Sequence, residues 1–69
     1  MTRLRELRLS RRLSLIDLCR ARGLNVSAVS QAERRKAAPS AKTRHELSRF
    51  YREPQEALFD REGLAAIAE

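Results

Sequence analysis

Apolar residues recur along this chain at intervals of three and four, which is the spacing of helices that bury one face. Leu4 and Leu7 begin the pattern, and β-branched residues are sparse throughout. No stretch alternates with a period of two, so the pattern indicates an all-α fold. Helices are predicted over residues 3–12, 14–22, 26–34, 41–51 and 54–59, followed by a short apolar tail of helical propensity at 64–69.

The ends of these predicted helices carry residues that favour helix termini. Ser, Thr and Asn side chains can accept a hydrogen bond from a free backbone N–H of a first turn. Gly23 suits the left-handed position just past a helix, and Pro54 suits a first turn. The expected N-caps are Thr2, Ser14 with Asp17 three residues later, Asn25 and Ser40.

The same spacing predicts which side chains form the core. Val26 can join the apolar stripe of the third helix or stand free of it. Cys19 is expected to be a small core residue and not a redox site. From the second helix onward, the expected inward positions are Leu15, Leu18, Cys19, Val29, Ala32, Leu47, Phe50, Tyr51, Leu58 and Phe59.

Length and composition exclude several classes of protein. The 69 residues are enough for one domain, and a single Cys excludes an internal disulfide. With His45 as the only His there is no cluster of zinc ligands. We find no catalytic constellation and no Gly-rich phosphate loop, so we expect no enzyme, metal or cofactor. The charged N-terminal ten residues fit neither a signal peptide nor a membrane span, which predicts a cytoplasmic protein.

Charge is unevenly distributed along the chain, whose formal net charge is +6. Residues 1–44 hold 12 Lys and Arg against three acids, a charge of +9. Residues 45–69 hold three Arg against six acids, a charge of −3. This asymmetry indicates that one surface faces a polyanion and another faces something else.

Residues 14–34 form two predicted helices joined through Gly23 and the capping Asn25, the pattern of a helix-turn-helix unit. The second helix of such a unit can enter the major groove of DNA. It must present short polar side chains there, so that its backbone can approach the base edges. The expected base contacts are Val26, Ser27, Ala28, Ser30 and Gln31.

With these features the chain resembles the Cro and phage-repressor type of helix-turn-helix domain, also called XRE-like. The resemblance covers about residues 4–59: "LRELRLSRRLS" resembles the family's first helix and its Leu-Ser entry into the second. "LIDLCRARGLNVSAVSQAER" resembles the motif itself, "PS" with "TRHELSRFY" the fourth helix, and "PQEALF" the fifth. The resemblance implies a compact, five-helix, lambda-repressor-like DNA-binding domain over residues 1–59. It also implies a transcriptional regulator, repressor-like and of phage or bacterial type.

Some positions depart from the family's pattern. Leu15 stands where the family often has a Gln that braces a phosphate, so that contact is in doubt. Arg35 stands where a Gly commonly ends the third helix, so either Arg35 is left-handed or the helix runs on. Arg44 and His45 replace apolar residues, and Arg52 replaces a common Gly. These changes predict either a less buried fourth helix or a separate contact on its exposed side.

Cations and caps flank the predicted reading helix, where the two phosphate strands of a duplex would lie. Arginine favours forked contacts with phosphate, and 13 of the 15 cations are Arg. The expected phosphate contacts are Arg8, Arg11, Arg12, Ser14, Asn25, Arg34, Arg35, Lys36 and Lys42.

The end of the chain from Leu58 to Ala68, which includes most of the C-terminal tail at residues 60–69, is more apolar than the end of a lone domain needs. We expect it to help form a homodimer interface, the alternative being that it covers the core. A symmetric dimer would bind a pseudo-palindromic operator of double-stranded DNA, with half-sites about 34–36 Å apart. The expected interface residues are Leu58, Phe59, Leu64 and Ile67.

A second hypothesis comes from another class of function. The polar substitutions in the fourth helix and the apolar tail also fit a protein-interaction module. Such a module would bind a transcription-machinery, toxin or repressor partner. RNA binding is a third and weaker hypothesis. RNA-binding proteins stack bases on aromatic side chains, but the three aromatic residues here, Phe50, Tyr51 and Phe59, are needed by the core.

Overall fold

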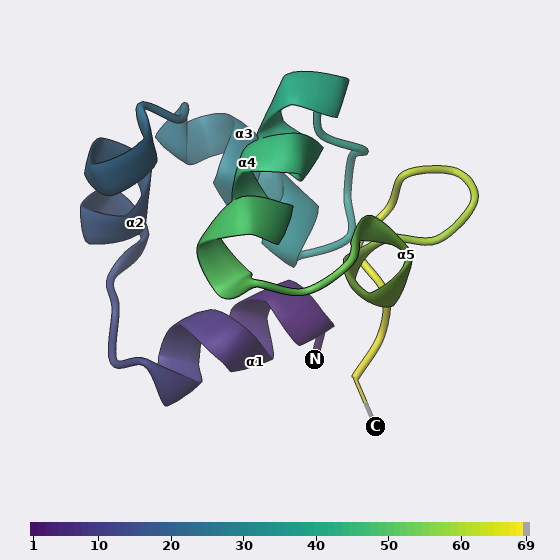
Figure 1. Ribbon diagram of the computed structural model, residues 1–69, viewed down its shortest axis with the longest axis horizontal. Helices are drawn as coiled ribbons and strands as arrows, with labels where there is room; N and C mark the ends of the chain where they lie inside the picture. The colour runs from purple at the N-terminus through teal and green to yellow at the C-terminus, as the bar shows by residue number, and fades with distance from the viewer. Residues whose placement is uncertain (69) are drawn as a thin grey trace.

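The computed structural model describes residues 1–68 as a single bundle of short helices (Figure 1). The expectation of an all-α fold is confirmed, with each predicted helix present at its expected place. None of the helices in this part of the chain is long and apolar enough to cross a membrane. The helices are α1 (Arg3–Ser10), α2 (Leu15–Arg22), α3 (Val26–Glu33), α4 (Ala41–Tyr51) and α5 (Gln55–Leu58).

Local capping chemistry explains where these helices begin. Each of the first four starts after a residue whose side-chain oxygen accepts a first-turn N–H, which satisfies one otherwise free donor. The caps are those predicted: Thr2, Ser14, Asn25 and Ser40. α5 differs, because Pro54 is its N-cap with no side-chain hydrogen bond, where it was expected inside the first turn.

Left-handed residues end the helices. Gly23 has φ of 64° directly after α2, as expected of a Gly at that position. Arg12, Arg35 and Arg52 have φ of 55–56° just past α1, α3 and α4. For α1 this turn ends the helix at Ser10, two residues before the predicted end. For Arg35, the left-handed alternative is the one adopted, although the conformation costs an L-residue roughly 1–2 kcal/mol.

The core lies where all five helices and the tail converge. Leu4 of α1, Leu18 of α2, Val29 of α3, Leu47 of α4 and Leu58 of α5 are at most 1% exposed. The core positions predicted at Cys19, Ala32 and Tyr51 are also buried, whereas Leu15 and Phe50 are only partly buried against the cluster. Val26 is 40% exposed, so it stands free of the apolar stripe of α3.

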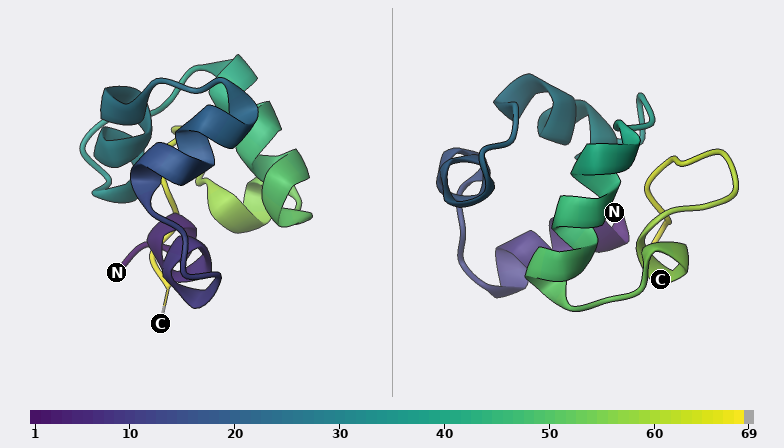
Figure 2. Two further views of the ribbon diagram at one scale, coloured as in Figure 1. Left: turned by 90° about the vertical axis from the view of Figure 1, so that its left-hand side faces the viewer. Right: turned by 45° about the horizontal axis from the view of Figure 1, so that its top comes forward.

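The C-terminal tail is extended, not helical, and it covers the core. Phe59 pairs with Ala65 and Thr2 pairs with Ile67 in isolated antiparallel bridges, so the two chain ends lie side by side (Figures 1 and 2). The backbone N–H of Arg3 donates to the carbonyl of Ala66 at 2.9 Å. The helical propensity of 64–69 is overridden by these pairings, and residue 69 lies outside the described residues.

This packing corrects part of the expected dimer interface. Leu58 is fully buried and Phe59 is 5% exposed within one chain, so neither can meet a partner. Leu64 is half-buried, and Ile67 is 57% exposed. Leu58 and Phe59 therefore belong to the core, as the alternative to a dimer interface expects.

Tyr51 carries a polar atom that the core does not satisfy. Its hydroxyl is buried without a hydrogen-bond partner among residues 1–68. Burial in this apolar setting, reinforced by the charge of Glu33, raises the pKa of Tyr51 to about 12. A buried hydroxyl without a partner typically costs a protein about 1–3 kcal/mol.

We therefore expect Tyr51→Phe to raise the free energy of unfolding by roughly 1–3 kcal/mol in urea denaturation at pH 7. The folded-state pKa of Tyr51 lies above its unfolded value of about 10. The stability that depends on protonated Tyr51 is therefore complete below about pH 10 and is lost as the pH rises toward 12. Tyr51→Phe should lose less stability than the wild type over that pH range. The loss that remains comes from other groups, such as the buried Cys19 thiol, because burial raises the pKa of Cys19 as well. An unchanged alkaline loss in Tyr51→Phe would contradict this assignment.

Candidate nucleic-acid interface

The tight turn between α2 and α3 fixes how the two helices meet. Gly23 and Leu24 both donate their N–H to the carbonyl of Cys19, which closes α2. Asn25 then starts α3 by accepting the N–H of Ala28 at 2.9 Å. The two helices contact each other, and Leu18 and Cys19 of α2 and Val29 of α3 are buried members of one core cluster; Figure 2 shows the arrangement of the ribbon. Residues 14–34 thus form two packed helices joined by a tight turn.

One side of α3 faces solvent, and all five predicted base contacts lie away from its buried face. The buried face of the helix consists of Val29, Ala32 and Glu33. The structure brings the remaining side chains together as a strip of short, uncharged groups. Val26, Ser27 and Gln31 are exposed, and Ala28 and Ser30 are half-buried.

A shallow groove of about 480 Å³ runs between the start of α3 and the segment that leads into α4. None of its lining residues is charged. Sequence reasoning missed the far wall, because it is formed by a connector whose path depends on tertiary packing. The groove is lined by Asn25, Ser27, Ala28, Gln31, Ala37, Ala38, Pro39, Ser40 and Thr43.

A larger hollow of about 600 Å³ lies elsewhere, between α5 and the turn at 60–63. Its lining includes the carboxylates of Glu56, Asp60 and Glu62. Arg44 and Arg61 also line the hollow, so three acids face two cations, and the net negative charge of the lining disfavours a polyanion. The groove beside α3, although smaller, is therefore the better candidate for nucleic acid.

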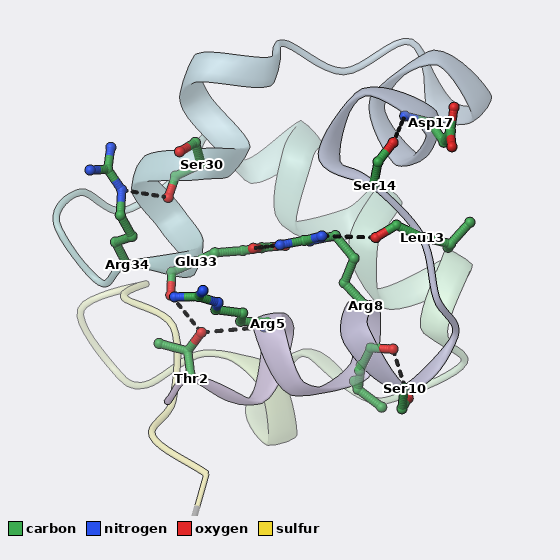
Figure 3. Close-up of polar contacts among 11 residues, drawn as sticks. Thr2, Arg5, Arg8, Ser10, Leu13, Ser14, Asp17, Ser30, Glu33 and Arg34 are labelled. Carbon is green, nitrogen blue, oxygen red and sulfur yellow. Dashed lines mark hydrogen bonds and ion pairs between the residues drawn. The ribbon is translucent and has the colours of Figure 1, made fainter.

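Arg8 does not take the role predicted for it. Its Nε donates to Glu33 Oε2 at 2.8 Å and its Nη2 to Oε1 at 3.1 Å, while Nη1 donates to the carbonyl of Leu13 at 2.8 Å (Figure 3). Its side chain is only 12% exposed and that of Glu33 3% exposed. The hydrogen bond with Glu33 raises the pKa of Arg8. This pair joins α1 to α3 inside the protein, so the predicted phosphate contact at Arg8 is wrong.

Two further cations are held by neighbours while remaining exposed. Arg35 Nη1 lies 2.8 Å from Asp60 Oδ2 and donates to the carbonyl of Ala65 at 2.8 Å, which ties the tail to the end of α3. Desolvation opposes ionisation of Asp60, but hydrogen bonds from Arg35 and the backbone outweigh it and lower the pKa of that carboxyl. The guanidinium of Arg11 lies over the Phe50 ring at 5.4 Å from its centroid.

The remaining predicted phosphate contacts are free to meet an anion. Ser14 and Asn25 lie exposed at the N-termini of α2 and α3, where backbone N–H groups and the helix dipole favour negative charge. The cations among these contacts are exposed and have no ion-pair partner among residues 1–68: Arg12, Arg34, Lys36 and Lys42.

Comparison of the chain with protein-family models, with curated proteins and with solved structures found no match. Function is therefore argued from the side chains and their arrangement. That arrangement can accept a narrow polyanion. The uncharged side chains on the open side of α3 border a groove, and exposed cations without ion-pair partners precede them in the chain at Arg12 and follow them at Arg34, Lys36 and Lys42.

Proposed function

We propose that this protein is a sequence-specific, double-stranded DNA-binding transcriptional regulator that places α3 in the major groove. The observation that carries the proposal is the strip of short, uncharged side chains on the open side of α3. A recognition helix can use such a strip, because short side chains let its backbone approach the base edges. The arrangement of α2 and α3 supports a helix-turn-helix unit and, with the sequence resemblance, a lambda-repressor-like domain.

In this proposal phosphate contacts supply affinity and base contacts supply discrimination. Arg12, Arg34, Lys36 and Lys42 neutralise phosphates and release condensed counterions. The N-termini of α2 and α3 add backbone donors to the same strands. A homodimer would double the short footprint of one α3 helix on a pseudo-palindromic operator. Ile67 and the half-buried Leu64 are the remaining apolar tail residues that a second copy could contact.

Binding to duplex DNA selected from a random library tests the proposal. Four of the predicted phosphate contacts on each protomer are free cations, so a plot of log K against log salt should have a slope of about −3 to −4 per protomer. Replacing Lys36 with Ala should reduce that slope by about 0.9 and weaken binding to all sequences alike. Arg61→Ala is the matched control, because this exposed cation lies beside the acidic hollow and should leave the slope unchanged. Failure to retain any duplex at low salt would contradict the proposal.

A second candidate function, a protein-interaction module, is favoured by one observation. Met1 and Ile67 are 65% and 57% exposed, and the Thr2–Ile67 bridge brings the chain ends that carry them together. Exposed apolar side chains that cluster tend to mark contacts. Capture from nuclease-treated lysate separates the two functions. A stable protein partner, with no retention of duplex by the purified chain, would favour this second function.

A further inference from the structure

Ser27 and Gln31 form a pair on the open side of α3. They lie one helical turn apart, and Gln31 Nε2 donates to Ser27 Oγ at 3.4 Å. Both side chains are exposed and both line the uncharged groove. Neither side chain makes another hydrogen bond within residues 1–68. This long hydrogen bond favours one orientation of the Gln31 carboxamide.

This restraint leaves the useful half of the carboxamide free. A Gln side chain has two N–H donors and one acceptor oxygen. A bidentate contact uses the oxygen and the N–H beside it, so the outer N–H can be donated to Ser27 without competition. The free half then presents one acceptor and one donor side by side. Adenine offers the complementary pair in the major groove, a donor at N6 and an acceptor at N7.

The lining of the groove disfavours the other bases. Guanine is read most often by Arg or Lys, and cytosine by a carboxylate, and the groove contains none of these groups. It does contain the methyl groups of Ala28 and Ala38. Methyl groups of this kind suit the C5-methyl of thymine, which pairs with adenine. Arg34, one turn beyond Gln31, lies with its Nε 3.4 Å from the carbonyl of Ser30, and it is not part of the lining.

We propose that Ser27 and Gln31 are an adenine-reading pair, in which Gln31 contacts the base and Ser27 is a positioning residue that holds the carboxamide. This inference rests on the proposed function, because it assigns a base to the same helix. It also changes the role of Ser27, which the sequence suggested as a base contact in its own right.

The test starts from duplexes that the wild-type protein selects from a random library. We expect an A·T pair at a position whose preference disappears in Gln31→Ala, with an affinity loss of about 5- to 150-fold. Replacing that adenine with 7-deazaadenine, which lacks the N7 acceptor, should weaken binding of the wild type but not of Gln31→Ala. Gln55→Ala on α5 is the matched control and should bind as the wild type does.

Variants at position 27 test the positioning role. Ser27→Ala should weaken binding to the adenine-containing duplex by about 2- to 10-fold, the effect of removing one neutral hydrogen bond. It should also reduce the effect of 7-deazaadenine. Ser27→Thr keeps a hydroxyl and should restore both values, whereas Ser10→Ala, at the exposed end of α1, should change neither.

The outcomes separate this inference from the proposed function. If the wild type retains no duplex, the proposed function fails and the inference fails with it. If the wild type selects a motif whose bases are unaffected by Gln31→Ala, or prefers guanine at the affected position, only the adenine assignment is overturned. If Ser27→Ala matches the wild type on every duplex, the positioning role is overturned.

Discussion

Replacing Arg8 with Met is expected to lower the free energy of unfolding by about 3–5 kcal/mol. The substitution keeps an unbranched apolar stem but removes the guanidinium, which leaves the carboxylate of Glu33 buried without its cation. Glu33 is 4% exposed overall, and its backbone carbonyl is already used by Thr2 Oγ1 at 2.6 Å. Domains are typically stable by only about 5–15 kcal/mol, so much of that margin would be removed. Urea denaturation followed by far-ultraviolet circular dichroism measures the change.

The double variant Arg8→Met/Glu33→Leu shows whether the loss comes from the unpaired charge. Replacing a buried ion pair with apolar side chains of similar volume is often neutral or stabilising. We therefore expect the double variant to recover most of the stability lost by Arg8→Met. Glu46→Ala is the control, because its 3.9 Å pair with Arg22 is more open to solvent and should change stability by less than about 1 kcal/mol. A double variant no more stable than Arg8→Met would contradict the assignment.

Truncation of Leu58 to Ala is expected to cost about 2–5 kcal/mol, because its side chain is fully buried and a cavity would remain. The destabilisation should be the same at low and high protein concentration, since Leu58 packs against side chains of its own chain. If Leu58 lay instead at a subunit interface, the destabilisation would depend on concentration. Thermal unfolding across a hundredfold range of concentration distinguishes the two.

Ile67→Ala provides the matched comparison from the same tail. This side chain is 57% exposed, so its truncation should change the stability of a single chain by less than about 0.5 kcal/mol. Sedimentation or light scattering of this variant then reports on dimerisation without disturbing the core. A large loss of stability on Ile67→Ala at low concentration would contradict the exposed position of this side chain.

The sequence determined the features that depend on near neighbours. Helix positions follow from apolar spacing, and helix starts follow from Thr2, Ser14, Asn25 and Ser40, each of which bonds within three residues of itself. The same local logic placed Gly23 after α2. It also placed the candidate base contacts on the open side of α3, because a 3.6-residue period fixes which positions oppose Val29 and Ala32.

Only the tertiary structure decided which charges are used internally and where the tail lies. Arg8 and Glu33 are 25 residues apart in the chain, so no local pattern could show that this cation of α1 would pair with α3. The extended tail follows from pairing with Thr2 and Phe59, which overrides helical propensity. The left-handed arginines have the same origin. Packing of the helices requires the chain to turn at Arg12, Arg35 and Arg52, whatever the local preference of an L-residue.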